Sequence, residues 1–355
     1  MPFKSTKYFY QIDFLRFWFA LTICYCHALF LLPQFYDTAT YQLLYQSRLN
    51  TQIATDFFFV IAGFFLFYKI PQSLVTFIKK KFIRLMPAIY ISWGFCFVLN
   101  TLNIQYDPLN QPNINLISLL PNIFMVDFFA GQSILGVTWF VNCLIWISLF
   151  YVLLYKTAAT KNFFLLTSLI IFISFNIICT NGIFFDNIFW GFLKLGIIRA
   201  LCAIGLGIFI YYAYQHAVSL IRNTFICSFL EIATIAYLIK GLYVTDFLAY
   251  PGLMIAFCCL FILFLVNKGI LSRFFNHRAW HFFGRISYVL FLIHLPVFFL
   301  TQAFIYLAGL PQSPWIFLLW LIVPTLIIAI LVHFLFEQPI INRLNKKFIQ
   351  GTVTP

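Results

Sequence analysis

Long apolar runs constrain this sequence more than any other feature. An α-helix needs about 20 apolar residues to cross the hydrocarbon core of a bilayer. Ten runs approach that length, and they predict membrane-spanning helices at Ile12–Leu32, Thr51–Tyr68, Leu85–Leu102, Val137–Tyr155, Phe163–Thr180, Phe192–Tyr212, Phe225–Leu242, Phe247–Val266, Phe282–Leu307 and Trp315–Phe336. Only 9% of the 355 residues are charged, whereas a soluble domain carries about 25%. We therefore predict an all-α, polytopic integral membrane protein.

The segment 115–130 is apolar but too short to count as a further span. It contains Pro121, Asn122 and Asp127, which suit a lipid-exposed helix poorly. We predict that it forms a re-entrant or interfacial helix on the outer side of the membrane. The chain has no separate soluble part and no internal repeat, so we expect a single transmembrane domain over 1–355.

Lysine and arginine residues gather in alternate gaps between the runs, as they do in the cytoplasmic loops of membrane proteins. These gaps and chain ends hold Lys4, Lys7, Lys69, Lys79, Lys80, Lys81, Arg84, Lys156, Lys161, Arg222, Lys268, Arg273, Arg278, Arg285, Arg343, Lys346 and Lys347. The opposite gaps hold Arg48 and Lys240 with Asp37, Asp107, Asp127, Asp186 and Asp246. Both termini are therefore predicted to be cytoplasmic. The spread of the net charge of +13 over many gaps also argues against nucleic-acid binding, which needs one solvated basic face.

The nine cysteines all lie inside apolar runs, and none stands beside histidines in a metal-binding pattern. We therefore expect no metal site, and we interpret these cysteines as small buried apolar residues. The first run is long enough to span, and no small-residue cleavage site follows it. We expect it to be a retained helix rather than a cleaved signal peptide.

The first run carries three ionisable residues, Asp13, Arg16 and His27. Ionisable residues inside a membrane are costly, and they often mark functional sites. At about 100° per residue, Arg16 and His27 lie about 20° apart around the helix, and Asp13 lies about 60° from Arg16. One helix face therefore carries a polar stripe, on which His27 lies about 16 Å beyond Arg16. Alternatively, Asp13 and Arg16 are interfacial, and His27 is satisfied by a neighbouring helix.

Other parts of the chain add ionisable and polar candidates. Asp56 lies at the start of the second run and requires a cationic or hydrogen-bonding partner from another helix. His294 lies seven residues after Ser287 and on the same helix face. Glu337 directly follows the last run. The basic cluster Lys79–Arg84 either sets the topology or binds phosphate groups at the cytoplasmic side.

Together these residues resemble the acyltransferase 3 family of membrane O-acyltransferases, and the resemblance spans nearly the whole chain. The matching positions are Asp13, Arg16 and His27 in the first run, Asp56 to Gly63 in the second, Lys81, Arg84 and Pro87 at the third, Gly284, Ser287, Tyr288 and His294 in the ninth, and Glu337 with Pro339 near the end. Ten helices with cytoplasmic termini also agree with this family.

Three positions depart from the family pattern. Ala62 stands where the family usually has a serine, so a hydroxyl there is either not required or replaced. Lys81 stands where the basic pair usually begins with arginine. Leu144 occupies the place of the glutamate in a Trp-Ser-Leu-x-x-Glu stretch, which begins here at Trp139.

The resemblance implies transfer of an acetyl or similar small acyl group from the co-substrate acyl-CoA to a hydroxyl group. Donor binding is then expected from Arg16, Lys80, Lys81 and Arg84, and catalysis from His27 with Asp13 and Arg16. His27 would act as a general base or as a transient covalent carrier of the acyl group. We expect Asp56 or Glu337 to fix its tautomer. Acceptor lining or oxyanion stabilisation is expected from Ser287, Tyr288 and His294.

The expected acceptor is a cell-surface polysaccharide or a lipid-linked glycan at the plasma membrane, and the acyl group is acetyl or succinyl. A transporter or flippase for a lipid-linked sugar is the main alternative, because ten helices with buried charges fit it equally well. Inverted repeats and paired broken helices would favour that alternative, and the sequence has neither. A glycan polymerase is a third possibility, for which we would expect a larger outer loop.

Overall fold

The computed structural model describes residues 8–32, 39–47, 53–71, 73–102, 104, 116–130, 134–184, 186–190, 193–220, 223–241, 250–310 and 313–351. The topology signals from Lys4, Lys7, Asp37, Arg48, Asp107, Arg222 and Asp246 lie outside these residues. The second, sixth and eighth predicted spans begin at residues outside this set, namely Thr51, Phe192 and Phe247. The seventh predicted span ends outside it, at Leu242.

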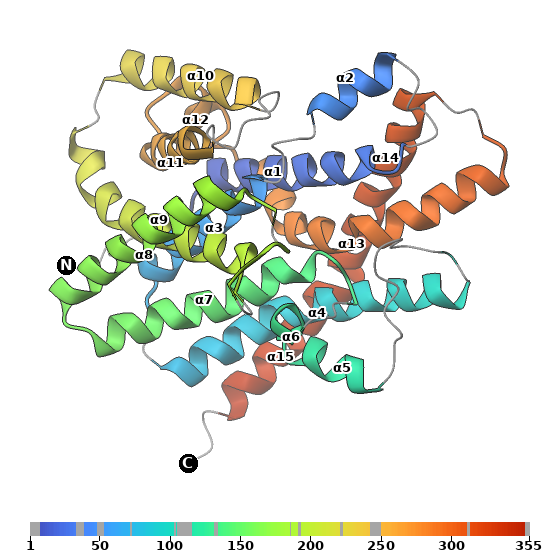
Figure 1. Ribbon diagram of the computed structural model, residues 1–355, viewed down its shortest axis with the longest axis horizontal. Helices are drawn as coiled ribbons and strands as arrows, with labels where there is room; N and C mark the ends of the chain where they lie inside the picture. The colour runs from blue at the N-terminus through green and yellow to red at the C-terminus, as the bar shows by residue number, and fades with distance from the viewer. Residues whose placement is uncertain are drawn as a thin grey trace.

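Helices account for nearly all of the described chain (Figure 1). Eight of the helices that the structure describes are long and apolar enough to cross a membrane: α1 (Tyr10–Leu29), α4 (Leu74–Thr101), α7 (Thr138–Thr157), α8 (Thr160–Asn181), α9 (Leu195–Leu220), α10 (Thr224–Gly241), α13 (Ala279–Leu307) and a continuous helix over Pro314–Lys347. Two apolar helices are shorter, α3 (Ala54–Tyr68) and α11 (Tyr250–Val266). A helical, multi-pass membrane protein is thereby confirmed. The count of ten crossings and the side of the termini stay predictions.

The last long helix continues well beyond the predicted span. It consists of α14 (Pro314–Val332), a π-helical turn (His333–Glu337) and α15 (Gln338–Gly351). At its start the Ser313 hydroxyl accepts a hydrogen bond from the backbone N–H of Ile316, and Pro314 occupies the first helical position, where no N–H is needed.

Helix α4 begins at Leu74, well before the predicted start at Leu85. Ser73 caps it by accepting a hydrogen bond from the backbone N–H of Thr76 at 3.5 Å. The basic cluster 79–84 was expected in the gap before this helix, and that placement is wrong. Lysine and arginine are good helix formers, so the helix runs through the charges although the apolar run does not.

The segment 115–130 folds back onto α7 as two short helices, α5 (Leu116–Ile123) and α6 (Asp127–Ala130). Asp127 fastens it, because its Oδ1 accepts a hydrogen bond from Asn142 Nδ2 at 2.8 Å. Trp146 Nε1 donates to the Met125 carbonyl at 2.6 Å. Neither helix is long enough to cross a membrane, in line with the prediction; the depth of the segment in the bilayer stays a prediction.

Four small elements complete the described chain: α2 (Ala39–Ser47), α12 (Ile270–Phe274), β1 (Ile188–Trp190) and β2 (Leu193–Lys194). The two strands pair antiparallel, with Ile188 opposite Lys194. Lys194 Nζ lies 2.6 Å from Asp186 Oδ1, which ties the second strand to the turn before the first. This hairpin is a small departure from the all-α prediction.

Helices α1 and α13 lie side by side and run in the same direction (Figure 1). Asp13 meets Gly284 near their N-terminal ends, and Cys24 Sγ lies 4.0 Å from the Leu290 carbonyl oxygen farther along. A Cβ on Gly284 would lie 2.3 Å from Asp13 Cγ, so only glycine fits at this contact. We call this contact the α1–α13 seam.

Helices α3 and α9 form a second tight contact, the α3–α9 seam. A Cβ on Gly63 would lie 2.1 Å from the Ile204 carbonyl oxygen, and one on Gly207 would lie 2.0 Å from the Val60 carbonyl oxygen. Small residues allow helix backbones to approach closely, as is common in lipid. Gly63 of the family-like stretch in the second run therefore has a packing role.

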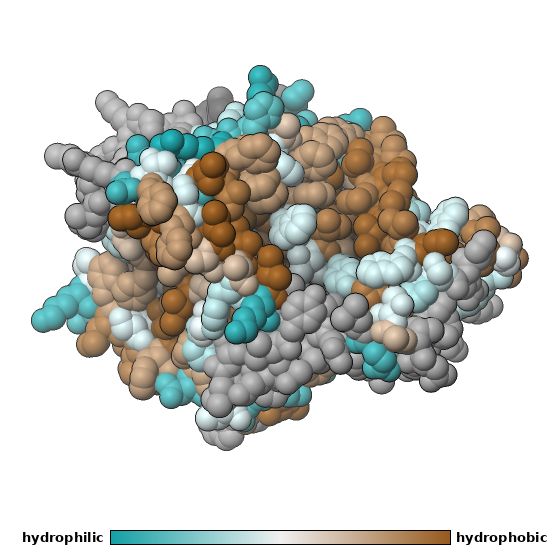
Figure 2. Space-filling view, turned by 90° about the horizontal axis from the view of Figure 1, so that it is seen from above, coloured by the Kyte–Doolittle hydropathy of each residue, from teal (hydrophilic) through white to brown (hydrophobic). Residues whose placement is uncertain are grey.

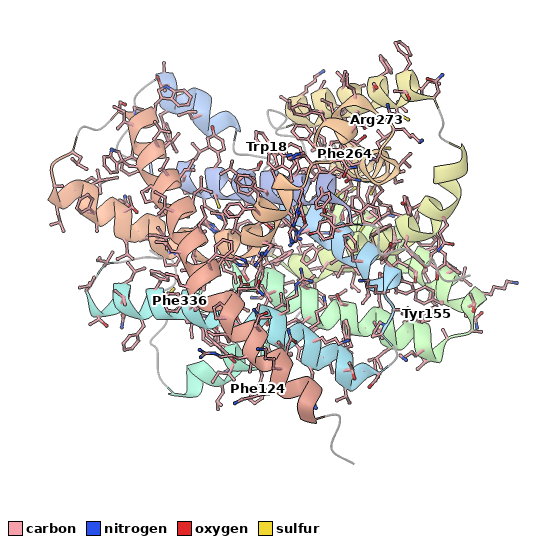
Figure 3. The ribbon with its side chains drawn as sticks, turned by 180° about the vertical axis from the view of Figure 1, so that it is seen from behind. Trp18, Phe124, Tyr155, Phe264, Arg273 and Phe336 are labelled. Atoms are coloured by element: carbon pink, nitrogen blue, oxygen red, sulfur yellow. The ribbon has the colours of Figure 1, made fainter. Side chains whose placement is uncertain are left out.

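Apolar side chains cover wide areas of the molecular surface (Figure 2). On α8, for example, Leu165, Leu169 and Phe172 are exposed. Inside the protein, aromatic side chains such as Phe264 fill the space between the helices (Figure 3). Phe336, in contrast, is exposed on the surface. So large an exposed apolar area is unfavourable in water and suits contact with lipid.

Candidate active site

His27 of α1 and His294 of α13 form a hydrogen-bonded pair across the α1–α13 seam. His27 Nδ1 lies 2.7 Å from His294 Nε2, and the rings are nearly parallel with centroids 4.9 Å apart. His294 is fully buried, whereas His27 is partly accessible. When His27 Nδ1 donates to His294, Nε2 of His27 keeps its lone pair. That lone pair can take a proton or attack a carbonyl carbon.

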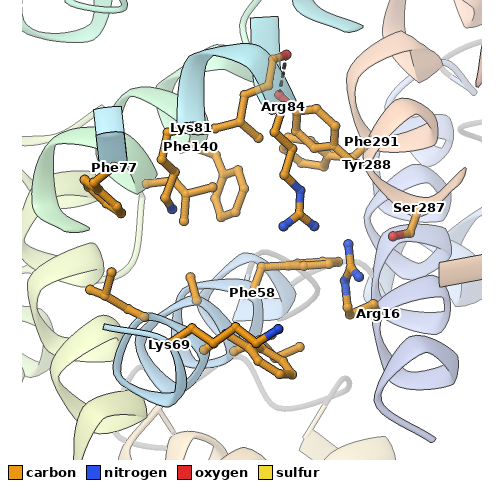
Figure 4. Close-up of a pocket in the computed structure, with 16 residues that line it drawn as sticks. Arg16, Phe58, Lys69, Phe77, Lys81, Arg84, Phe140, Ser287, Tyr288 and Phe291 are labelled. Atoms are coloured by element: carbon orange, nitrogen blue, oxygen red, sulfur yellow. Dashed lines mark hydrogen bonds between the residues drawn. The ribbon is translucent and has the colours of Figure 1, made fainter. Parts of the chain in front are cut away.

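A cavity of about 290 Å³ lies between α1, α3, α4, α7 and α13 (Figure 4). Four cationic side chains line it: Arg16, Lys69, Lys81 and Arg84. The guanidinium groups of Arg16 and Arg84 enter the central space from opposite sides in Figure 4. Of the described residues that line the cavity, none is an aspartate or a glutamate. Four cations gathered around one small cavity repel one another, so the cavity is suited to a polyanion.

The structure separates the four predicted donor-binding residues. Arg16, Lys81 and Arg84 line the cavity, since Lys81 and Arg84 are three residues apart on one face of α4. Lys80 is exposed and does not line it. Lys69 does line it, although the sequence analysis treated it only as a topology signal. Its position directly after the last residue of α3, level with the basic end of α4, was the available clue.

Asp13 connects Arg16 to α13. Its Oδ1 lies 3.3 Å from Arg16 Nη1, and its Oδ2 accepts a hydrogen bond from Tyr8 Oη at 2.5 Å. His281 Nδ1 lies 2.6 Å from Tyr8 Oη and 3.3 Å from Asp13 Oδ2. Partial burial and the neighbouring Asp13 raise the pKa of Tyr8, so it stays a donor near neutral pH. Asp13 lies about 21 Å from His27 along α1, so it can position Arg16 but does not contact His27.

A family model described as an acyltransferase domain, that of acyltransferase 3, matches residues 9–334. The chain belongs to the acyltransferase 3 family. The protein is therefore a membrane acyltransferase, and the matched region contains the histidine pair and the cavity. No curated protein and no solved structure is significantly similar to it.

Asp56 of this acyltransferase belongs to a buried ion pair. Arg199 Nε donates to both Asp56 carboxylate oxygens, at 3.0 and 3.2 Å, and Tyr250 Oη donates to Oδ2 at 3.1 Å. Thr55 Oγ1 accepts from Arg199 Nη2 at 2.8 Å. Asp56 is fully buried and Arg199 is 1% exposed. The expectation of a cationic partner was correct. Arg199 links α3 to α9, and Tyr250 links α3 to α11.

Glu337 pairs with His333 in the π-helical turn. The expectation that Asp56 or Glu337 holds His27 is therefore wrong, because each of them binds another residue and His294 holds His27. Sequence reasoning missed this because His27 and His294 are 267 residues apart. The only clue in the sequence was that both histidines lie well inside spans that are predicted to begin at the cytoplasmic side.

Ser287 and Tyr288 lie one to two turns before His294 on α13, and both line the cavity. Ser287 Oγ donates to the Gly284 carbonyl at 2.8 Å, and Tyr288 Oη donates to the Leu85 carbonyl at 3.1 Å. The structure thus places these two predicted acceptor residues beside the cationic side chains, while His294 contacts His27.

Two departures from the family pattern converge on the same cavity. Ala62 of α3 and Leu144 of α7 both line it. The hydroxyl and the carboxylate that the pattern has at these positions are replaced by apolar groups. This acyltransferase therefore has a cavity wall that is apolar at both places. No carboxylate is among the described lining residues, and Asp13, which pairs with Arg16, lies outside the lining.

Proposed function

We propose that this acyltransferase moves an acetyl or similar small acyl group from acyl-CoA to a hydroxyl of a cell-surface polysaccharide or lipid-linked glycan. The observation that carries the proposal is that the α1–α13 seam holds polar groups at two places along its length. It has Arg16 and the cavity at one end and the His27–His294 pair at the other. Such a transfer requires a binding site for the polyanionic donor, which the cavity offers, and a base or nucleophile, which the histidine pair offers.

The cavity supports acyl-CoA as the donor through its charge. CoA carries several phosphate charges at one end and a thioester on a long flexible arm. Arg16, Lys69, Lys81 and Arg84 offer hydrogen-bond donors that suit phosphate oxygens. At about 290 Å³ the cavity lies at the small end of ligand pockets. It therefore suits part of the donor, while the rest of the nucleotide stays outside.

In the proposed reaction His27 Nε2 removes the proton of the acceptor hydroxyl. The oxygen attacks the thioester carbonyl, the C–O bond forms, and the C–S bond breaks. The sulfur leaves as the CoA thiolate, which takes up a proton as His27 returns to its neutral form. His294 keeps His27 Nδ1 engaged, so that Nε2 faces the reactants.

His27 Nε2 could instead attack the thioester itself. In that route the acyl group is held on the ring, and the CoA thiolate leaves before the acceptor hydroxyl takes over the acyl group. Rapid mixing of the protein with radiolabelled acyl-CoA in the absence of acceptor separates the two routes. Label retained on wild-type protein and absent from His27→Ala supports the covalent route.

The proposal places the Arg16 end of α1 at the cytoplasmic side of the plasma membrane, where acyl-CoA is made. The basic residues of α4 and α15 then lie at the same side, as the positive-inside rule requires. His27 lies nearer the outer side, about 16 Å along the helix from Arg16. Donor and acceptor would thus approach from opposite sides.

Alkali-labile acyl esters on the surface glycans of the native host give the direct test. Three strains are compared: the intact strain, a deletion strain and one that expresses His27→Ala at the wild-type level. We expect one specific ester to disappear in both altered strains, which would also identify the acceptor. An unchanged ester profile in the deletion strain, with glycan lost from the surface, would contradict the proposal and support a flippase.

A further inference from the structure

Phe291 lies between the cavity and the histidine pair. It stands four residues after Ser287 and three before His294, so the three residues share one face of α13. Its ring lines the cavity, and its centroid is 6.0 Å from that of His294. With 4% of its surface exposed, Phe291 fills the space along this face. A group that leaves the cavity along the seam meets this ring before it meets a histidine.

Phe140 of α7 and Phe58 of α3 extend the barrier. The ring centroid of Phe140 is 5.2 Å from that of Phe291 and 6.1 Å from that of Phe58, and all three rings line the cavity (Figure 4). Neither His27 nor His294 is among the described residues that line it. We call these three rings the aromatic wall, and its Phe291 ring both lines the cavity and lies next to the histidine pair.

We propose that the aromatic wall selects a short, uncharged acyl group and that Phe291 sets the length that can reach His27. The inference rests on the proposed transfer from acyl-CoA. The thioester carbonyl reaches the histidine pair only when the acyl group occupies space beside or in place of the Phe291 ring. Extra atoms forced into a close-packed site are unfavourable, so each added methylene lowers the rate of transfer.

A carboxylate at the end of the acyl group is rejected for a second reason. Burying a charge among phenyl rings without a partner is strongly unfavourable. The cations that would neutralise it, Arg16 and Arg84, line the cavity, and neither histidine is among the described residues that line it. They therefore hold a carboxylate away from His27. A succinyl-type donor binds in the cavity and blocks it, whereas an acetyl-type donor passes.

The test measures CoA release from acetyl-CoA, butyryl-CoA and succinyl-CoA in membrane vesicles that contain the full chain and the host's acceptor. Vesicles with His27→Ala give the background. The wild type should use acetyl-CoA best and should be competitively inhibited by succinyl-CoA. Phe291→Leu and Phe291→Ala should raise the ratio of butyryl to acetyl kcat/KM by about 10-fold, because two methylenes gain room at roughly 0.8 kcal/mol each.

Phe77→Ala is the matched control, since Phe77 lines the same cavity at the cationic end, with Lys81 Nζ 5.6 Å from its ring centroid. It should change KM for all three donors alike and leave the ratio unchanged. Phe140→Leu opens the same wall from α7 and replaces the Phe291 variants if they fail to fold.

Four outcomes decide the inference. A raised butyryl ratio with succinyl-CoA still unused supports it. An unchanged ratio in the folded wall variants overturns the role of the wall in length selection, and efficient use of succinyl-CoA by the wild type overturns the exclusion of charge. Absence of CoA release from every donor in the wild type overturns the proposed function instead, and the inference with it.

Discussion

The α1–α13 seam and the α3–α9 seam both contain a paired aspartate, a glycine and an ionisable partner, but they differ in whether a basic group faces a cavity or only its neighbouring helices. In the α3–α9 seam, Asp56 and Arg199 satisfy each other, and Thr55 and Tyr250 use the remaining positions. In the α1–α13 seam, Arg16 faces a cavity and His27 keeps a ring nitrogen that its bond to His294 does not use. The first arrangement holds helices together, and the second leaves reactive groups available to a ligand.

This difference shows how to sort the charged residues of a membrane protein. A motif residue whose hydrogen-bonding groups are all taken by neighbouring helices is explained by packing, and its loss is a loss of stability. A motif residue whose groups face a cavity is explained by a ligand, and its loss is a loss of activity. The predictions that follow test whether the two seams separate in this way.

The largest expected effect is on catalysis at the α1–α13 seam. His27→Ala should lower acyl transfer by at least about 100-fold, because general-base catalysis by histidine contributes that much or more. Its thermal unfolding should stay close to that of the wild type. His277→Ala, which removes an exposed histidine outside the cavity, is the control and should keep full activity. Equal losses in both variants would contradict a special role for His27.

The second effect is on stability at the α3–α9 seam. Asp56→Ala leaves Arg199 buried without its carboxylate and should lower the free energy of unfolding by about 3–5 kcal/mol. The matched control is Asp186→Ala, which breaks the more exposed pair with Lys194 and should cost about 0–1 kcal/mol. Thermal unfolding in one detergent compares the two. If Asp56→Ala is as stable as the control and loses activity, Asp56 belongs with the catalytic residues.

The third effect concerns the tautomer of His27. His294→Leu removes the acceptor for His27 Nδ1 and should lower kcat by about 10–100-fold, by analogy with the loss of a hydrogen-bond partner that orients a metal-binding histidine. His294→Gln, whose side-chain oxygen can accept the same hydrogen bond, should recover part of the loss. KM for the donor should change little in either variant. Equal activity of the two variants would show that the hydrogen bond is not what His294 contributes.

The smallest effect distinguishes two neighbours on α4. Arg84→Ala should raise KM for acyl-CoA by about 10-fold, since hydrogen bonds to charged groups contribute about 1.5–3 kcal/mol. Lys80→Ala should change it by less than about 3-fold, because Lys80 does not line the cavity and a surface charge contributes at most about 1 kcal/mol. The same CoA-release assay serves both. A larger effect from Lys80→Ala would favour the donor site expected from the sequence over the cavity.

The sequence predicted the polar face of α1 because helical periodicity alone decides that Arg16 and His27 share a side. It could not predict their partners. Arg199 lies 143 residues from Asp56 and His294 lies 267 from His27, and the sequence alone does not show which spans are neighbours. Lys80 was assigned to the donor site because the start of α4 was placed too late, which hid the helix face that Lys81 and Arg84 share.

The parallel contact between α1 and α13 also bears on how the chain is made. Synthesis runs from the N-terminus, so His27 is made 267 residues before His294 exists to meet it. Until the ninth predicted span follows, Asp13, Arg16 and His27 lack the helix that covers them, and charged groups facing lipid are unfavourable. Chains that stop before α13 should therefore leave the insertion machinery poorly and be prone to degradation. The polar stripe of α1, which serves catalysis in the complete protein, thus makes an incomplete chain recognisable to the cell's quality control.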